Sequence, residues 1–104
     1  MAKVYWTVDA RSDLLAIGAH IGRDSPAFAR IFVLRVTRAT RHLSRFPMIG
    51  RVVPEFEDES LREVIFQNYR VVYRVRRGEI GILAVVHGAV DLAAVAERRP
   101  WELG

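Results

Sequence analysis

Hydrophobic side chains recur at helical spacing in two stretches of the first half of the chain. In the first stretch they fall at Ala10, Leu14, Ile17 and Ile21. This spacing places them on one face of a helix. Asp9 precedes the stretch as a candidate N-cap, and Gly22 follows it as a candidate C-terminal stop. The pattern predicts a first amphipathic helix between these two residues.

A second helix is predicted to begin at Asp24-Ser25-Pro26, where a capping residue precedes a proline of the first turn. Its apolar face consists of Phe28, Ile31, Phe32, Ala39 and Leu43. We expect it to end near Phe46-Pro47, because proline disfavours a helical conformation in the residue before it. The connector at residues 22–25 is short, so the two helices should pack antiparallel.

The second half of the chain has the residue pattern of β-strands. Strands are predicted at 61–66, 69–76 and 80–87, with turns at 67–68 and 77–79, short earlier strands at 3–8 and 51–53, and a short helix at 91–98. Hairpin-linked strands form an antiparallel sheet, against which the helix pair buries its apolar faces. The prediction is a two-layer α+β fold of order β-α-α-β-β-β, with residues 1–104 forming one domain.

The predicted strand at 69–76 carries two rows of side chains, because successive residues of a strand point to opposite faces. One row is Tyr69, Val71, Tyr73 and Val75, and the other is Arg70, Val72, Arg74 and Arg76. We expect the first row to pack beneath the helices and the second row to face water or a ligand.

Two further residues are expected near the arginine row. The hairpin at 77–79 brings His87, which ends the last strand, close to Tyr69 and Arg70. The turn at 67–68 brings Arg62 near the residues around Arg74, on a face that depends on the strand register. These residues also have an ordinary structural interpretation. Arginines often cover the face of a sheet or pair with nearby acids, and a histidine at a strand end is commonly a surface or core residue.

The charge of the chain favours an acidic partner. It has 16 basic and 12 acidic residues, for a formal net charge of +4, and Lys3 is its one lysine. Arginine binds phosphate and carboxylate groups through a planar fork, although a GC-rich genome also favours arginine codons. The composition is therefore consistent with binding to nucleic acid or to an acidic protein.

Other classes of chemistry lack support in the sequence. The chain has no cysteine, which excludes disulfides and thiolate metal sites. It has no leader-like start and no apolar run of membrane-spanning length, so a soluble cytoplasmic protein is expected. Phosphate-loop, paired-histidine and nucleophile-elbow motifs are missing, and we therefore expect no metal and no cofactor.

Three segments carry a resemblance to a known family: LREVIFQNYRVVYRV at 61–75, IGILAVVHGAVDL at 80–92 and FPMIGRVVPEF at 46–56. With the order β-α-α-β-β-β, they are similar to the RelE/ParE superfamily of bacterial type II toxins, the plasmid-stabilisation proteins, over nearly the whole chain. The stretch from Arg70 to Val75 is the most specific part. The resemblance implies a growth-arresting toxin that is neutralised by an antitoxin from the same operon.

The resemblance also implies the partners of the chain. A cognate acidic antitoxin would have a folded DNA-binding part and an extended segment that wraps the toxin, so operator DNA is reached only through the antitoxin, and no membrane is involved. A basic protein with apolar helix grooves can accept an acidic amphipathic helix or an added strand. The target differs within the superfamily, because ParE-like members inhibit DNA gyrase and RelE-like members cut mRNA in the ribosomal A site.

The RelE-like interpretation implies a metal-independent endoribonuclease. The 2′-hydroxyl of the RNA attacks, and the protein supplies a base, an acid and positive charge for the transition state. The catalytic candidates are Arg70, His87, Arg74 and Arg62. Arg70 would stabilise the phosphate and His87 would act as acid or base. Glu55 or Glu63 matches the partner carboxylate only loosely.

Two features differ from such nucleases. Gly88 follows His87 where nucleases often carry tyrosine or another functional side chain, and the lysine-rich strand of many RelE enzymes is missing. The VVH ending at 85–87 also resembles ParE-like sequences, in which His87 would be structural. The sequence therefore favours gyrase inhibition. The alternatives are mRNA cleavage and a toxin-like co-repressor partner without activity.

Overall fold

The computed structural model describes residues 1–99 and 101. Its elements are β1 (Lys3–Trp6), α1 (Val8–Asp24), α2 (Pro26–His42), β2 (Arg51–Val52), β3 (Leu61–Phe66), β4 (Tyr69–Arg76), β5 (Glu79–His87) and α3 (Leu92–Arg98). The predicted element order is confirmed, including the short strand near residue 51 and the short last helix. Within the described part of the chain, no helix is long and apolar enough to cross a membrane.

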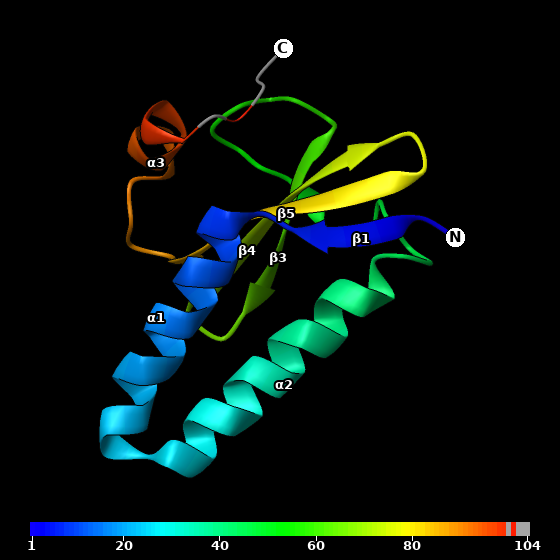
Figure 1. The fold of residues 1–104 in the computed structure, drawn as a ribbon. Helices are drawn as coiled ribbons and strands as arrows, with labels where there is room; N and C mark the ends of the chain where they lie inside the picture. The colour runs from blue at the N-terminus through cyan, green and yellow to red at the C-terminus, as the bar shows by residue number, and fades with distance from the viewer. Residues whose placement is uncertain (100, 102–104) are drawn as a thin grey trace.

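The strands form one sheet of five, in the order β1-β5-β4-β3-β2. The predicted antiparallel hairpins β3-β4 and β4-β5 are present. The first strand, β1, instead pairs in parallel with β5 at one edge, so the sheet is mixed. Figure 1 shows α1 and α2 side by side as an antiparallel pair, with α3 apart from them. The α+β class is confirmed, and β4 lies at the centre of the sheet.

The start of α1 differs from the prediction. Thr7, and not Asp9, is its N-cap: the Thr7 hydroxyl accepts the Ala10 N–H at 3.1 Å and donates to the Ile82 carbonyl at 2.8 Å. A threonine at this position satisfies a free helix N–H and also ties the helix to β5. Asp9 lies in the first turn, where a negative charge interacts favourably with the helix dipole.

The connection between the helices is shorter than predicted. Gly22 does not stop α1, which continues to Asp24, and Ser25 alone caps the end of α1 and the start of α2. A methyl group at Gly22 would lie 3.6 Å from Ala29 Cβ, so this glycine lies where the two helices approach each other. Its small size therefore serves packing inside the helix and not termination.

The end of α2 also precedes its predicted position. The helix ends at His42, and the chain continues as tight turns before Pro47. In these turns the Leu43 N–H donates to the Thr40 carbonyl and the Ser44 N–H to the Arg41 carbonyl, each at 3.1 Å. Helices often end in such tightened turns.

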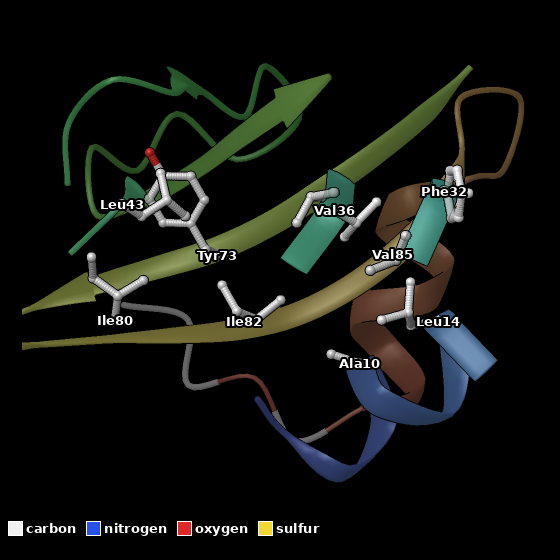
Figure 2. Packing of buried hydrophobic residues seen from close by; sticks show 10 residues of the cluster. Ala10, Leu14, Phe32, Val36, Leu43, Tyr73, Ile80, Ile82 and Val85 are labelled. Carbon is white, nitrogen blue, oxygen red and sulfur yellow. The ribbon is translucent and has the colours of Figure 1, made fainter. Parts of the chain in front are cut away.

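The main core lies between the helix pair and the sheet. Figure 2 shows apolar side chains of α1 and α2 meeting those of β4 and β5. The cluster contains Ala10, Leu14, Phe32, Val36, Leu43, Val71, Tyr73, Ile80, Ile82 and Val85. Tyr69 and Val75 pack against its margin. The prediction that the Tyr69 row packs beneath the helices is therefore confirmed.

The opposite face of the sheet is mostly covered, so the prediction that its arginines face water is wrong at Arg70 and Arg74, whereas Arg76 is exposed. A second apolar cluster lies there, containing Val53, Leu61, Val72, Leu83, Ala84, Val86, Leu92 and Val95. The residues from α3 and Val53 cover the face because their apolar side chains need a partner surface. As a result Arg70 and Arg74 are each only 8% exposed.

One ion pair joins α3 to the rest of the fold at the edge of β5. The strand β1 pairs with β5 only as far as Ile82, so Val85 lies on a part of β5 without that neighbour. There the Val85 N–H donates to Asp13 of α1 at 3.0 Å. Arg99, which follows α3, donates to both carboxylate oxygens of Asp13 at 2.7 Å and to the Leu83 carbonyl at 3.3 Å. This pairing raises the pKa of Arg99. The ion pair thus satisfies edge groups of β5 while it anchors the covering helix.

A second polar contact is buried beneath the sheet at Tyr73. Its hydroxyl accepts the Gly50 N–H at 2.9 Å and donates to the Pro47 carbonyl at 2.8 Å. A Cβ at Gly50 would lie 2.5 Å from this hydroxyl, so only glycine permits the approach. Burial raises the pKa of Tyr73. The contact fixes the segment that leads from α2 into β2.

We predict that Tyr73→Phe lowers the free energy of unfolding by about 1–3 kcal/mol, because the Gly50 N–H is left buried without its acceptor. Urea-induced unfolding measures the change. Tyr69→Phe is the matched control, since it removes a hydroxyl from the same strand face, and it should change stability by less than about 0.5 kcal/mol. Equal losses in the two variants would contradict the role given to the Tyr73 hydroxyl.

We predict that Asp13→Ala lowers the free energy of unfolding by about 3 kcal/mol, because the Arg99 guanidinium and the Val85 N–H lose their acceptor. Combining Asp13→Ala with Arg99→Ala should cost clearly less than the sum of the two single changes, as expected for residues in contact. Asp9→Ala in the same helix is the control, with a cost below about 1 kcal/mol. Additive losses in thermal or urea unfolding would show that the pair is not coupled.

Candidate functional site

Two of the predicted site residues meet at one end of the sheet. The register pairs Tyr69 with His87 and Arg70 with Val86, which confirms that His87 lies close to Tyr69 and Arg70. An open pocket of about 680 Å³ lies there. It is lined by Arg51, Pro54, Glu55, Ile65, Gln67, Asn68, Tyr69, Arg70, His87, Gly88 and Ala89. The pocket is therefore built from both hairpins and from the loop that follows β2.

Arg70 is held by two carboxylates. Its Nε donates to Glu63 Oε1 at 2.6 Å, and its two terminal nitrogens donate to the two oxygens of Glu55 at 2.7 Å each. Glu63 also accepts from Arg51 Nε at 2.7 Å. Each of the three Arg70 nitrogens thus already has an anionic partner. The fork of this arginine is bidentate on Glu55, which is among the stronger geometries available to the pair.

The surroundings explain the electrostatics of this cluster. Glu63 is only 1% exposed, so its charge is stable there only because Arg70 and Arg51 bind it. The hydrogen bond from Arg70 lowers the pKa of Glu55, and the two glutamates raise the pKa of Arg70. Two arginines thus pair with two glutamates, so the formal charges of the cluster balance.

His87 is exposed at the rim of the same pocket. Its Nδ1 accepts the Ala89 N–H at 3.0 Å, which requires this nitrogen to be unprotonated. The ring packs edge-on against Tyr69, with the ring centroids 5.5 Å apart. The turn after β5 thus orients the imidazole and leaves Nε2 as the nitrogen able to exchange a proton with a ligand.

The other two candidates lie elsewhere. The register places Arg62 opposite Tyr73, and Arg62 donates to the Gly50 and Glu59 carbonyls at 2.9 Å. Leu61 is the residue opposite Arg74. Because side chains alternate along β3, Arg62 points to the helix side of the sheet and Arg74 to the other side. The four arginine and histidine candidates therefore do not form one site, and only Arg70 and His87 line the same pocket.

The carboxylate partners of Arg70 were underestimated from the sequence. Glu55 belongs to the acidic stretch that reads as a solvated loop, and Glu63 is one of two loose matches to a catalytic carboxylate. A signal for Glu63 does exist in the sequence. Glu63 lies two residues after Leu61 on the same strand, so the two side chains share a face of the sheet. Once Leu61 is assigned to a buried face, Glu63 must be buried as well and needs a cation beside it. Arg51 carries no comparable signal.

Comparisons with known proteins give a consistent picture. The family model described as the ParE toxin of the type II toxin–antitoxin system parDE matches residues 4–92. Toxin RelE2 of Caulobacter vibrioides is 37% identical over 90 residues, which cover 86% of this chain and 98% of that toxin. A solved structure titled as the chromosomal ParDE TA system from P. aeruginosa matches with a TM-score of 0.69 and 26% identity, covering 84% of this chain and 96% of the other.

These matches extend over the pocket, since the family model spans β1 to the start of α3. The family model and the curated toxin match the superfamily that the sequence resembles, and the solved structure matches its fold. The chain therefore belongs to the ParE toxin family of type II toxin–antitoxin systems.

Proposed function

We propose that this toxin arrests growth by inhibiting DNA gyrase, in the manner of ParE-like members of the superfamily, until its antitoxin binds it. The observation that supports this target over RNA is the state of Arg70. A nuclease needs donors aimed at the charge that develops on the phosphate. Here each Arg70 nitrogen already donates to Glu55 or Glu63. The same two carboxylates would repel an incoming phosphate.

The chemistry of Glu55 adds a second argument. A general base works best when its pKa lies near the working pH. The hydrogen bond from Arg70 moves the pKa of Glu55 further below neutrality. Glu55 is thus a weak proton acceptor for an RNA 2′-hydroxyl, and the pair resembles a structural ion pair more than an acid–base couple.

The proposed partners follow from the surface charge and from the family. The net charge of +4 favours a cognate antitoxin that is acidic, and operator DNA would be contacted through that antitoxin only. Exposed apolar side chains on α2, at Phe28, Ile31 and Leu34, offer it an amphipathic face. We place the complex in the cytoplasm, where both proposed targets are found.

Ribosome-dependent mRNA cleavage is the second candidate, and one observation supports it. Glu55, Arg70 and His87 all line the same open pocket. A bound RNA could use His87 as the acid if Glu55 first released Arg70 to the phosphate. This alternative therefore predicts a rearrangement of the ion cluster on binding, which gyrase inhibition does not require.

The two targets separate in paired assays on wild-type protein and His87→Ala. His87 is exposed, so its removal should leave the fold intact, whereas removing Arg70 would strand the buried Glu63. We expect both proteins to inhibit gyrase supercoiling equally and neither to cleave mRNA in a reconstituted translation system. Cleavage by the wild type that is lost in His87→Ala would instead establish the nuclease. Growth unaffected by induced expression would favour the inactive co-repressor.

The Glu55–Arg70 pair should also produce a defined pH dependence of stability. Because the pKa of Glu55 is lowered from 4.5 in the folded protein, its stabilising contribution is present above pH 4.5 and is lost as the pH falls through the folded value. We expect Glu55→Gln to reduce the free energy of unfolding by about 1–2 kcal/mol at pH 7. The difference from wild type should shrink below pH 4.5.

Urea unfolding between pH 7 and pH 3 measures this effect, and Glu59→Gln is the control because it removes an exposed carboxylate from the same loop. The control should change little at either pH. A difference between Glu55→Gln and wild type that stays constant with pH would show that Glu55 does not pair with Arg70 as a carboxylate.

A further inference from the structure

Arg74 lies in a row of residues that crosses the sheet on the face opposite the helix pair. The register aligns Tyr5 with Gly81, Gly81 with Arg74 and Arg74 with Leu61. A Cβ at Gly81 would lie 2.6 Å from the Tyr5 hydroxyl oxygen, so that hydroxyl rests directly over the backbone of Gly81. The missing side chain of Gly81 therefore lets a hydroxyl donor approach the place where Arg74 leaves the sheet.

A pocket of about 310 Å³ lies at this row, separate from the one beside His87. Its lining consists of Tyr5, Thr7, Arg74, Arg76, Glu79, Leu83 and Trp101. Two arginines and one glutamate contribute charged groups to the lining. Tyr5 and Trp101 supply aromatic walls with one polar group each.

Arg74 and Arg70 are equally buried but differ in their partners. Both are 8% exposed, and each Arg70 nitrogen donates to a carboxylate. In Arg74, one terminal nitrogen is buried and has no hydrogen-bond partner among residues 1–99 and 101. A guanidinium stays protonated at any physiological pH, and a buried cation without an acceptor is costly.

Asp58 is attracted to Arg74 electrostatically, but no hydrogen bond between the two side chains is present in the described residues. Its Oδ1 already accepts from the Ser60 N–H at 2.9 Å and from the Ser60 hydroxyl at 2.7 Å. These bonds are the main cause of the lowered pKa of Asp58, and attraction to Arg74 is the smallest contribution. Among the described residues, this buried Arg74 nitrogen is therefore left without an acceptor.

We propose that this pocket is a binding site for a single carboxylate group, held by the Arg74 guanidinium and the Tyr5 hydroxyl. A carboxylate matches the planar fork of arginine, and its one negative charge suits a pocket that already contains Glu79. A phosphate dianion would meet stronger repulsion from the same glutamate. The site is independent of the proposed target, because it lies away from the pocket that contains His87.

The carboxylate we propose is that of an aspartate or glutamate in an extended segment of an acidic partner protein, which the net charge of +4 favours.

The test uses sodium acetate as the probe on the full chain, with sodium chloride at equal ionic strength as the reference. The readouts are the NMR signals of the Arg74 Nε–H and the Trp101 indole N–H. Arg74→Met removes the proposed ligand-binding group and should keep the fold, since it removes an unpaired buried charge. Arg77→Met is the matched control, because Arg77 is exposed in the turn between β4 and β5. Tyr5→Phe is a milder second variant.

A saturable shift of the Trp101 indole N–H with millimolar acetate, kept in Arg77→Met, weaker in Tyr5→Phe and absent in Arg74→Met, supports a site for a partner carboxylate. The proposal is overturned if the wild type shows no saturable shift or if chloride gives the same shift. Tighter binding of inorganic phosphate than of acetate also overturns it.

Discussion

Arg70 lies on the central strand, near one end of a sheet that is covered on both faces, and its side chain is buried, so its charge must be neutralised where it lies. The helix pair covers one face of β4, and the cluster around Val72 and α3 covers the other. In such a place a guanidinium is stable only with anions in direct contact. Glu63 supplies one from the neighbouring strand, and Glu55 supplies the other from the loop after β2. The loop after β2 must therefore bring Glu55 within reach of Arg70.

The covering helix creates a similar demand at the edge of the sheet. Because α3 lies over the face of β5, the Leu83 carbonyl and the Val85 N–H come close to Asp13 and Arg99. These two charged residues are far apart in sequence, yet they are the groups that join the first helix to the end of the last one. Burial of α3 therefore places its flanking arginine where it can pair with Asp13.

The sequence predicts local features of this fold well, because they depend on neighbouring residues. Alternation along β4 correctly separates Tyr73 from Arg70, and the serine–proline pair correctly marks the start of α2. Asp9 and Gly22 misled the prediction for a physical reason. Thr7 caps α1 because its hydroxyl also contacts the Ile82 carbonyl of a distant strand. Gly22 stays inside α1, where it packs against α2.

The site was harder to predict, because its state is set by contacts between distant segments. Proximity of Arg70 and His87 follows from hairpin geometry and was predicted correctly. Burial of the arginine face does not follow, since it requires that α3 fold back over β5. The register also includes an irregularity between Val72 and Tyr73, which no pattern in the sequence signals. Pairing of Arg70 with both glutamates depends on these tertiary features.

The same tertiary features bear on what the pocket can do. Glu55 lies between Val53, which is fully buried, and Phe56, whose ring packs edge-on against Trp101 with the centroids 6.1 Å apart. Releasing Arg70 toward a phosphate therefore means displacing a loop whose neighbouring residues are part of the second apolar cluster. The binding free energy of a ligand would have to offset that loss of packing as well as the broken ion pair. A target recognised through the outer surface of the toxin makes no such demand, which is why the packing of this loop favours a protein target over catalysis at Arg70.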